Sequence, residues 1–418
     1  NCVQNDVQQK RKREDKMYSN VERTRWLRVA VGTVMMLCLG TLYAWSIFRA
    51  PFGALYPSWT TADLSMNFTI SMVCYSAGGF LGGKLSKKTS NTVTALAAAV
   101  LIFVGFLGVS WLSADPETAK VQLYLFYGVL SGLGTGFGYN TIVSGVGGWF
   151  PDKNGLATGV LLTGFGLGTM LIGQLADALI PVVGLPTLFR AFAVVIAVVL
   201  ALGSPMVRLP GAGTVLPPPP ATAQVEEQRD YTSGEMIRRP AFWLFFLWNM
   251  LMCASGLLVI NSAAEIAAYY GAAAVLGLLL SVFNGLSRIP FGVLVDKFGR
   301  RKVMLLANGF LLLSGGLLVL GGMGRSAALV LAGMLIMGVC YGNSVTIGTL
   351  VIRQFYGSAH YATNLAIVNC CAIPASFIGP LIASALQTAS GGDYTTTFLC
   401  VLAFAAVDLL VGFWVKKP

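Results

Sequence analysis

Twelve apolar segments, each long enough to cross a lipid bilayer, constrain this chain of 418 residues more than any other feature. A run of about 18 to 20 apolar residues is typical of a membrane-spanning helix, whereas strands of membrane barrels are about 10 residues of alternating character. The segments lie near residues 27–49, 67–86, 91–113, 122–143, 156–180, 185–206, 241–261, 273–295, 303–323, 326–349, 362–387 and 396–415. We therefore predict an all-α polytopic membrane protein with twelve transmembrane helices.

A proline-rich, polar stretch between Met206 and Pro240 divides these segments into two sets of six. Such a composition is typical of a linker rather than of a packed element. The predicted domains are a disordered cytoplasmic N-terminal arm (1–25), an N-terminal six-helix half (26–206), a cytoplasmic linker (207–239) and a C-terminal six-helix half (240–418). Within the arm, Met17 is a candidate start of the native chain.

The net charge of +11 follows membrane topology rather than a nucleic-acid surface. When the N-terminus is placed in the cytoplasm, 23 of the 28 Lys and Arg residues fall in cytoplasmic segments. This asymmetry obeys the positive-inside rule and predicts that both termini are cytoplasmic. Eight cysteines and one histidine show no CxxC or Cys–His spacing, so we predict no metal and no other cofactor.

The two halves share a weak internal repeat. At an offset of 205 residues, Thr141-Ile142 aligns with Thr346-Ile347, and Phe150 aligns with Phe355. Both matches fall around the same loop, which connects the fourth and fifth segments of each half. A parallel six-helix repeat predicts a solute-binding site between the halves, near the middle of the membrane.

Arg288 needs an explanation, because a guanidinium inside a membrane helix costs about 2.5 to 3.5 kcal/mol on insertion scales. One alternative is snorkelling, in which the side chain extends to the cytoplasmic surface. The neighbours of Arg288 instead favour a water-filled cavity, because they form one polar or small stripe at helical spacing. The stripe consists of Ser281, Asn284, Gly285, Arg288 and Gly292. We expect Arg288, with Asn284 beside it, to bind a carboxylate bidentately.

The segment that follows this stripe, GVLVDKFGRRK, resembles the loop signature of the major facilitator superfamily, G-x-x-x-D-[RK]-x-G-[RK]-[RK]. The resemblance implies the major facilitator fold, with twelve helices in two halves. It also implies a conformational role for the signature residues, which are Gly292, Asp296, Lys297, Arg300 and Arg301. We expect Asp296 to lie at the N-terminus of the fifth membrane helix, in the other half, where a carboxylate is favourable.

Three stretches resemble a narrower group, the oxalate/formate antiporter family, which is related to the monocarboxylate transporters. They are YAWSIF (43–48), GWFPDKNGLATG (148–159) and NGLSRIPFG (284–292). In that family the arginine of the third stretch binds the substrate carboxylate, so the resemblance gives this role to Arg288. It also implies that Tyr43 and Tyr139 line the substrate cavity.

Two positions depart from these families. Lys87 stands where the first-half copy of the loop signature would carry an aspartate. Family members that exchange oxalate carry a lysine in the eleventh helix, and the corresponding residue here is Cys371, with Asn369 as the nearby polar residue. We therefore expect Asn369 and Cys371 to line a site for a substrate with less charge than oxalate.

These observations predict a secondary active transporter that exchanges small organic anions, above all monocarboxylates, by alternating access. The alternative is proton-coupled monocarboxylate symport. The absence of an acidic residue beside Arg288 in its segment disfavours symport, whereas Asp408 in the twelfth segment leaves it open. The functions of a receptor, an enzyme, or a sugar or drug carrier account less well for an arginine in the membrane at position 288.

The expected partners are a small carboxylate substrate and the lipid bilayer, with no nucleic acid. We expect the chain to work as a monomer in the plasma membrane.

Overall fold

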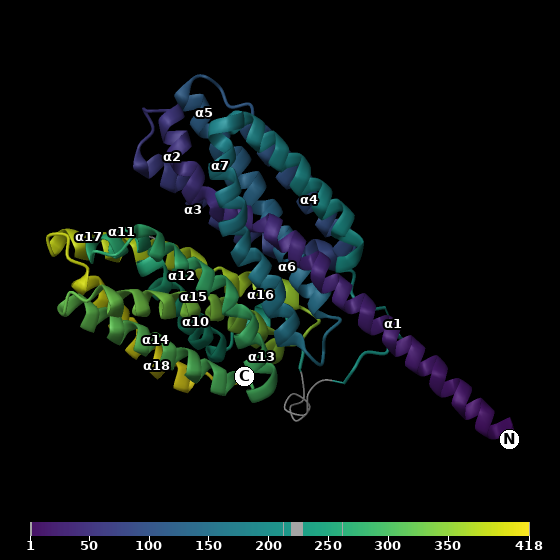
Figure 1. Cartoon of the computed structure of the whole chain (residues 1–418). Helices are drawn as coiled ribbons and strands as arrows, with labels where there is room; N and C mark the ends of the chain where they lie inside the picture. The colour runs from purple at the N-terminus through teal and green to yellow at the C-terminus, as the bar shows by residue number, and fades with distance from the viewer. Residues whose placement is uncertain (1, 212, 219–228, 261, 418) are drawn as a thin grey trace.

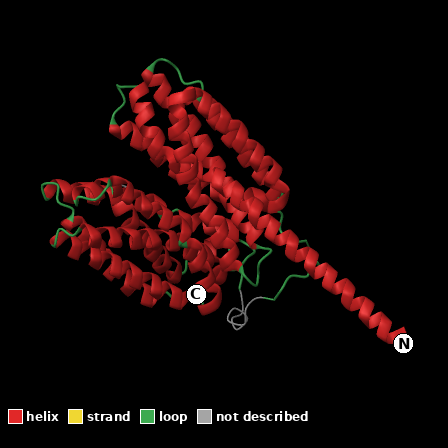
Figure 2. Cartoon of the chain, in the orientation of Figure 1, coloured by secondary structure: helices red, strands yellow, loops and turns green. Residues whose placement is uncertain are grey.

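The structure is a computed structural model that describes residues 2–211, 213–218, 229–260 and 262–417. Within these ranges the chain consists of helices and connecting loops, without a strand (Figure 2). The predicted all-α class is therefore confirmed. Residues 212 and 219–228 of the predicted linker lie outside the described residues.

The first half forms a bundle in which α1 packs on α7, α3 packs on α6, and α4 packs on both α6 and α7. A π-helix, η2, interrupts the fourth predicted span. The elements of this half are α1 (Cys2–Leu39), η1 (Gly40–Ala44), α2 (Trp45–Leu55), α3 (Thr61–Lys88), α4 (Asn91–Val109), α5 (Pro116–Leu123), η2 (Tyr124–Ser131), α6 (Gly132–Gly147), α7 (Asn154–Gly203) and η3 (Ser204–Val207).

The second half forms a similar bundle, in which α14 packs on α15 and α18, and α10 packs on α17 and α18. Two of its membrane spans are broken, one between α12 and α13 and the other between α16 and α17. The elements are α9 (Ser233–Ile237), α10 (Pro240–Ile260), α11 (Ala263–Tyr269), α12 (Ala274–Leu286), α13 (Arg288–Phe298), α14 (Arg300–Met323), α15 (Ala327–Tyr356), α16 (Tyr361–Asn369), α17 (Ala372–Ala389) and α18 (Thr395–Trp414).

Nine helical stretches among the described residues are long and apolar enough to cross a membrane. One of them, Asn154–Val207, contains two spans, because its backbone turns at Gly184, where φ is 77° and ψ is 158°. We call residues 154–183 the first arm of α7 and residues 185–203 its second arm. The more polar α3 and the run of α5, η2 and α6 supply the remaining two predicted spans.

The N-terminal arm differs from the sequence expectation. We predicted disorder for residues 1–25, whereas α1 begins at Cys2 and runs without a break into the first membrane span. The physical reason is that the arm is rich in Lys, Arg, Gln and Glu, which are good helix formers. Once the membrane span has nucleated the helix, the arm can extend it without a further free-energy cost of nucleation.

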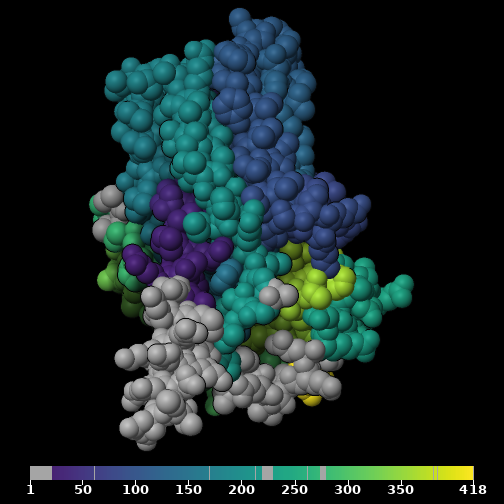
Figure 3. Space-filling model, turned by 90° about the vertical axis from the view of Figure 1, so that its right-hand side faces the viewer, coloured from purple at the N-terminus to yellow at the C-terminus, as the bar shows by residue number. Residues whose placement is uncertain are grey.

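The two halves meet near the end of the molecule that carries both chain termini, and they diverge toward the opposite end (Figure 1). We call these the closed end and the open end. The first arm of α7 packs on α12 and α13, and α3 packs on α16. The space-filling view shows the blue α3–α4 region of the first half against the lime-green α16 region of the second (Figure 3).

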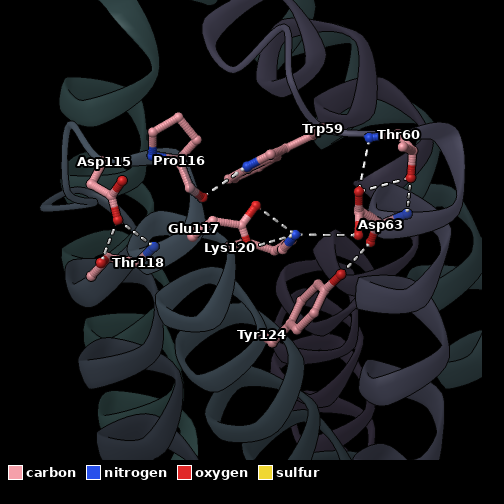
Figure 4. Close-up of polar contacts among 9 residues, drawn as sticks. All are labelled: Trp59, Thr60, Asp63, Asp115, Pro116, Glu117, Thr118, Lys120 and Tyr124. Atoms are coloured by element: carbon pink, nitrogen blue, oxygen red, sulfur yellow. Dashed lines mark hydrogen bonds and ion pairs between the residues drawn. The ribbon is translucent and has the colours of Figure 1, made fainter.

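Polar contacts fix the open end of the first half (Figure 4). The Asp63 carboxylate accepts hydrogen bonds from the side chain and backbone of Thr60, and Lys120 lies 3.6 Å from it. These hydrogen bonds, followed by the attraction of Lys120, hold the pKa of the Asp63 carboxyl below its usual range. The Tyr124 hydroxyl donates to the Asp63 carbonyl at 2.9 Å, so the start of α3 is tied to α5 and η2.

Candidate functional site

Arg288 is the first residue of α13, directly after the break that separates α13 from α12. Its side chain is only 4% exposed. One guanidinium nitrogen donates to the Leu162 carbonyl of α7 at 2.6 Å, and the other donates to the Asn284 side-chain oxygen at 3.1 Å. The guanidinium therefore points to the boundary between the halves and does not extend to the cytoplasmic surface, which argues against snorkelling.

The glycines of α7 make room for Arg288. A Cβ atom at Gly166 would lie 3.0 Å from the guanidinium carbon, and one at Gly159 would lie 2.5 Å from the Arg288 carbonyl oxygen. A side chain at Gly159 would push α13 away from α7, and one at Gly166 would displace the guanidinium of Arg288. Small residues permit helix backbones to approach closely in membranes. The glycine-rich sequence of the fifth span thus positions Arg288 of the eighth span.

Four tyrosines, two of them unforeseen, lie within electrostatic range of the guanidinium. The phenol groups of Tyr43, Tyr75, Tyr139 and Tyr341 lie close enough to Arg288 to interact with it electrostatically. The rings of Tyr43 and Tyr139 both pack edge-on against Phe165, at centroid distances of 5.6 and 5.1 Å. The structure therefore brings the predicted Tyr43 and Tyr139 to Arg288.

The sequence reading missed Tyr75 and Tyr341. The available signal for Tyr341 is its place in the repeated unit, where YGN at 341–343 lies near the position that corresponds to YN at 139–140.

Cys371 lies in the break between α16 and α17 and is 2% exposed. Asn249 of α10 donates a hydrogen bond to its sulfur atom at 3.0 Å. Cys371 belongs to a small buried cluster with Cys253, Ala254 and Ala375, and Tyr341 packs against this cluster. Asn369 is the partly buried last residue of α16, and its role stays a prediction.

At the closed end, Asp296 lies at the N-terminus of α7, as expected. Its two carboxylate oxygens accept hydrogen bonds from the backbone N–H groups of Gly155, at 2.8 Å, and Leu156, at 3.0 Å. Gly292 allows this approach, because a Cβ atom there would lie 2.1 Å from the Gly155 carbonyl oxygen. Hydrogen bonds to a charged group contribute about 1.5 to 3 kcal/mol, so this contact favours the closed end.

The basic residues of the loop signature lie outside this contact. Lys297 and Arg301 are exposed, whereas the Arg300 guanidinium lies 4.6 Å from the ring centre of Phe355 in α15. Arg300 thus anchors the signature loop to its own half. In the first half, Lys87 at the end of α3 contacts the ring nitrogen Nδ1 of His360, immediately before α16.

The sequence profile of the Major Facilitator Superfamily matches residues 29–263 and 249–418. The chain belongs to the Major Facilitator Superfamily. The solved structure of a superfamily member, the proton:xylose symporter XylE bound to 6-bromo-6-deoxy-D-glucose, has the same fold, with a TM-score of 0.73 and 15% identity. The alignment covers 95% of this chain and 96% of that one.

Known transporters are among the relatives that are similar to this chain in sequence. The oxalate:formate antiporter of Oxalobacter formigenes is 26% identical over 401 residues, which cover 92% of this chain and 90% of the relative. The apicoplast pyruvate carrier 1 of Toxoplasma gondii is 27% identical, over 66% of this chain and 69% of the relative. The family and fold therefore indicate a multi-pass membrane transporter and not an enzyme, with twelve helices in two halves, as predicted.

Replacing Asp296 with asparagine should weaken the closed end of this superfamily member without a loss of substrate affinity. The amide retains an acceptor but loses the charge that interacts with the α7 N-terminus, an interaction worth about 0.3 to 2 kcal/mol. We expect turnover to slow and the fraction of molecules that are open at the end with the chain termini to rise by up to about thirtyfold. Electron–electron resonance distances between labels on the two halves measure this population. A pure rise in KM with unchanged turnover contradicts the gating role.

Replacing Gly155 with alanine should prevent full closure at the same place. The new Cβ atom would lie 2.0 Å from the Gly292 carbonyl oxygen and 2.7 Å from an Asp296 oxygen, and neither can retreat without separating the halves. We expect at least about a tenfold shift in the same distance measurement, since each 1.4 kcal/mol is tenfold. Gly309→Ala is the matched control, because a Cβ atom there meets open space. Normal closure in Gly155→Ala would show that this contact is not needed.

Proposed function

We propose that this transporter exchanges small monocarboxylates across the membrane by alternating access, with Arg288 as the anion anchor. The observation that carries the proposal is the environment of the guanidinium. It is buried at the boundary between the halves, and among the described residues it bonds to two neutral oxygen atoms and has no carboxylate partner. Its Nε atom has no hydrogen-bond partner there. A buried cation in such a position is stabilised by an anionic substrate.

The chemistry of the residues around Arg288 suits a short carboxylate. The guanidinium presents a planar set of N–H donors that matches the two oxygens of one carboxylate. Phenol groups from both halves lie within electrostatic range of the guanidinium and offer hydroxyl groups as hydrogen-bond partners, while their rings offer apolar surface to a short carbon chain. The names of two relatives, an oxalate:formate antiporter and a pyruvate carrier, agree with a carboxylate substrate.

Exchange rather than net uptake follows from the charge of the empty site. Conversion between open states passes through a stage in which the site is shut off from water. An unpaired guanidinium is costly in that stage, and a bound carboxylate offsets its charge. The loaded carrier therefore converts readily between its two open states, and the empty carrier does not. This difference couples the outward movement of one anion to the inward movement of another.

The test is uptake of labelled pyruvate into proteoliposomes that contain the purified full chain. We expect rapid uptake only when the vesicles are loaded with unlabelled monocarboxylate, and no change when an ionophore removes the proton gradient. Uptake into empty vesicles that an inward proton gradient drives would contradict exchange.

Proton-coupled symport is the second candidate, and Asp408 of α18 is the observation that favours it. The residue is fully buried, and neither carboxylate oxygen has a hydrogen-bond partner among the described residues. In lipid such a residue marks a functional site more often than a structural one. Under symport, Asp408→Asn abolishes uptake that a proton gradient drives, whereas under exchange it leaves counterflow intact.

We further propose that the protein lies in the plasma membrane, with the closed end and both termini in the cytoplasm. The charge asymmetry of the sequence supports this orientation. The structure then represents the outward-open state. A single chain supplies both halves of the transport path, so we propose that the monomer is the working unit.

A further inference from the structure

The two contacts between signature loops and helix starts at the closed end are not alike. In one, the carboxylate of Asp296 reaches across from the second half to the start of α7. In the other, Lys87 replaces the carboxylate, and a lysine cannot accept hydrogen bonds from N–H groups at a helix start. The backbone N–H groups before α16 therefore need another acceptor.

Asp230, near the end of the linker, is that acceptor. One of its carboxylate oxygens accepts hydrogen bonds from the backbone N–H groups of Ser358, at 2.8 Å, and Ala359, at 2.9 Å. The preceding Gly357 has a φ of 79°, and a Cβ atom there would lie 2.1 Å from the same oxygen. Both the backbone turn and the absent side chain at Gly357 thus make room for this carboxylate.

Residues on both sides of Asp230 hold it in place. The Tyr231 N–H donates to the Tyr356 carbonyl at 3.0 Å, and its carbonyl accepts from the Asn364 side chain at 3.0 Å. The Ser233 hydroxyl donates to the Asn364 side-chain oxygen at 2.8 Å. Tyr231 is 6% exposed and Tyr356 is fully buried. The linker segment 230–233 is therefore packed as a part of the second half.

Lys87 connects this segment to the first half. Its ammonium group contacts His360, the residue that follows the Asp230-bound turn by one position. Burial lowers the pKa of Lys87, and the attraction of Asp230 opposes that change. The ammonium of the first half thus lies in the field of a carboxylate that is fixed to the second.

We propose that Asp230 supplies, from the linker, the carboxylate that the first-half signature lacks, and that Lys87, His360 and Asp230 form a second latch at the closed end. In this latch the charged group that crosses between the halves has the opposite sign to the one in the Asp296 contact. There the carboxylate crosses between the halves, whereas here the cation crosses and the carboxylate caps the turn of its own half.

This arrangement makes the linker a working part of the gate, which can open only when Lys87 leaves His360 and moves out of the field of Asp230. Both residues are exposed to water, so the attraction between them is modest and salt weakens it. The inference rests on alternating access and not on the identity of the substrate.

The test measures the fraction of molecules in which the closed end, which carries the chain termini, has opened. Electron–electron resonance distances between labels on α3 and α16 give this fraction in reconstituted, substrate-free protein. We expect Lys87→Ala and Asp230→Asn each to raise the open fraction relative to the closed by about two- to fivefold at low salt, the range of a surface ion pair. Asn keeps an acceptor for the turn, so Asp230→Asn isolates the loss of charge. Lys88→Ala, a neighbouring exposed lysine, is the matched control and should change nothing.

The double variant separates a latch from a purely structural cap. If Lys87 and Asp230 act as a pair, Asp230→Asn adds little once Lys87 is alanine, and high salt reduces both single effects. The proposal is overturned if Asp230→Asn has the same effect with and without Lys87, or if neither single variant moves the distances. Because no substrate is present, this result does not depend on the proposed monocarboxylate exchange.

Discussion

Arg288→Gln should reduce transport at least about a hundredfold while leaving folded protein in the membrane. Truncating one partner of a buried charge pair costs about 3 to 5 kcal/mol, and each 1.4 kcal/mol is tenfold. Glutamine keeps an N–H donor for the Leu162 carbonyl or the Asn284 oxygen that Arg288 binds. It therefore preserves much of the contact between the halves and removes the charge.

Labelled pyruvate exchange measures the loss, and thermal unfolding of the purified variant measures the fold. Arg190→Gln is a suitable control, because this arginine of the second arm of α7 bonds to Ser110 in its own half, away from Arg288. Arg288→Lys keeps the charge but loses the planar fork, so we expect intermediate transport. Near-normal exchange by Arg288→Gln would remove Arg288 as the anion anchor.

The unmodified protein should prefer monocarboxylates to oxalate by at least about a hundredfold. One guanidinium offsets one carboxylate. The resemblance to oxalate exchangers implies that Cys371, whose sulfur accepts a hydrogen bond from Asn249, stands at the position of their second cation. The second carboxylate of oxalate would therefore be buried without a counter-charge, at a cost of several kcal/mol. Such a cost corresponds to two or more factors of ten in affinity.

Cys371→Lys should raise the affinity for oxalate relative to pyruvate, because the new ammonium would start from the buried cluster against which Tyr341 packs. Competition of oxalate with labelled pyruvate in both proteins measures the change. Cys371→Met is the matched control, since methionine has a similar length and no charge. Equal oxalate affinity in the Lys and Met variants would show that position 371 does not face the second carboxylate.

Much of the fold could be predicted from the sequence because membrane insertion imposes a simple rule. Every span must satisfy its backbone hydrogen bonds internally, so a long apolar segment has one available structure. The same rule made Arg288 conspicuous, since a cation in such a segment needs a reason. Hydropathy alone identifies a span less clearly where the span is polar or interrupted. This applies to α3 and to the run of α5, η2 and α6, which were predicted as spans only as members of the set of twelve.

The parts that the sequence did not reveal are contacts between distant segments. Asp230 lies in a polar stretch where composition predicts only a linker, yet it binds backbone groups 128 and 129 residues away. Tyr75 and Tyr341 look like ordinary residues of apolar helices, and only the packing of three helices brings them to Arg288. Asp296 was located correctly because a family signature already encodes its long-range contact.

Counterflow in proteoliposomes tests the central claim most directly. Vesicles that contain the full chain are loaded with unlabelled pyruvate, and entry of external labelled pyruvate is measured in competition with formate, lactate and oxalate. The account predicts transient accumulation of label that depends on the internal monocarboxylate, strong competition by lactate or formate, and weak competition by oxalate. Absence of counterflow with every carboxylate, or a preference for oxalate, would contradict it.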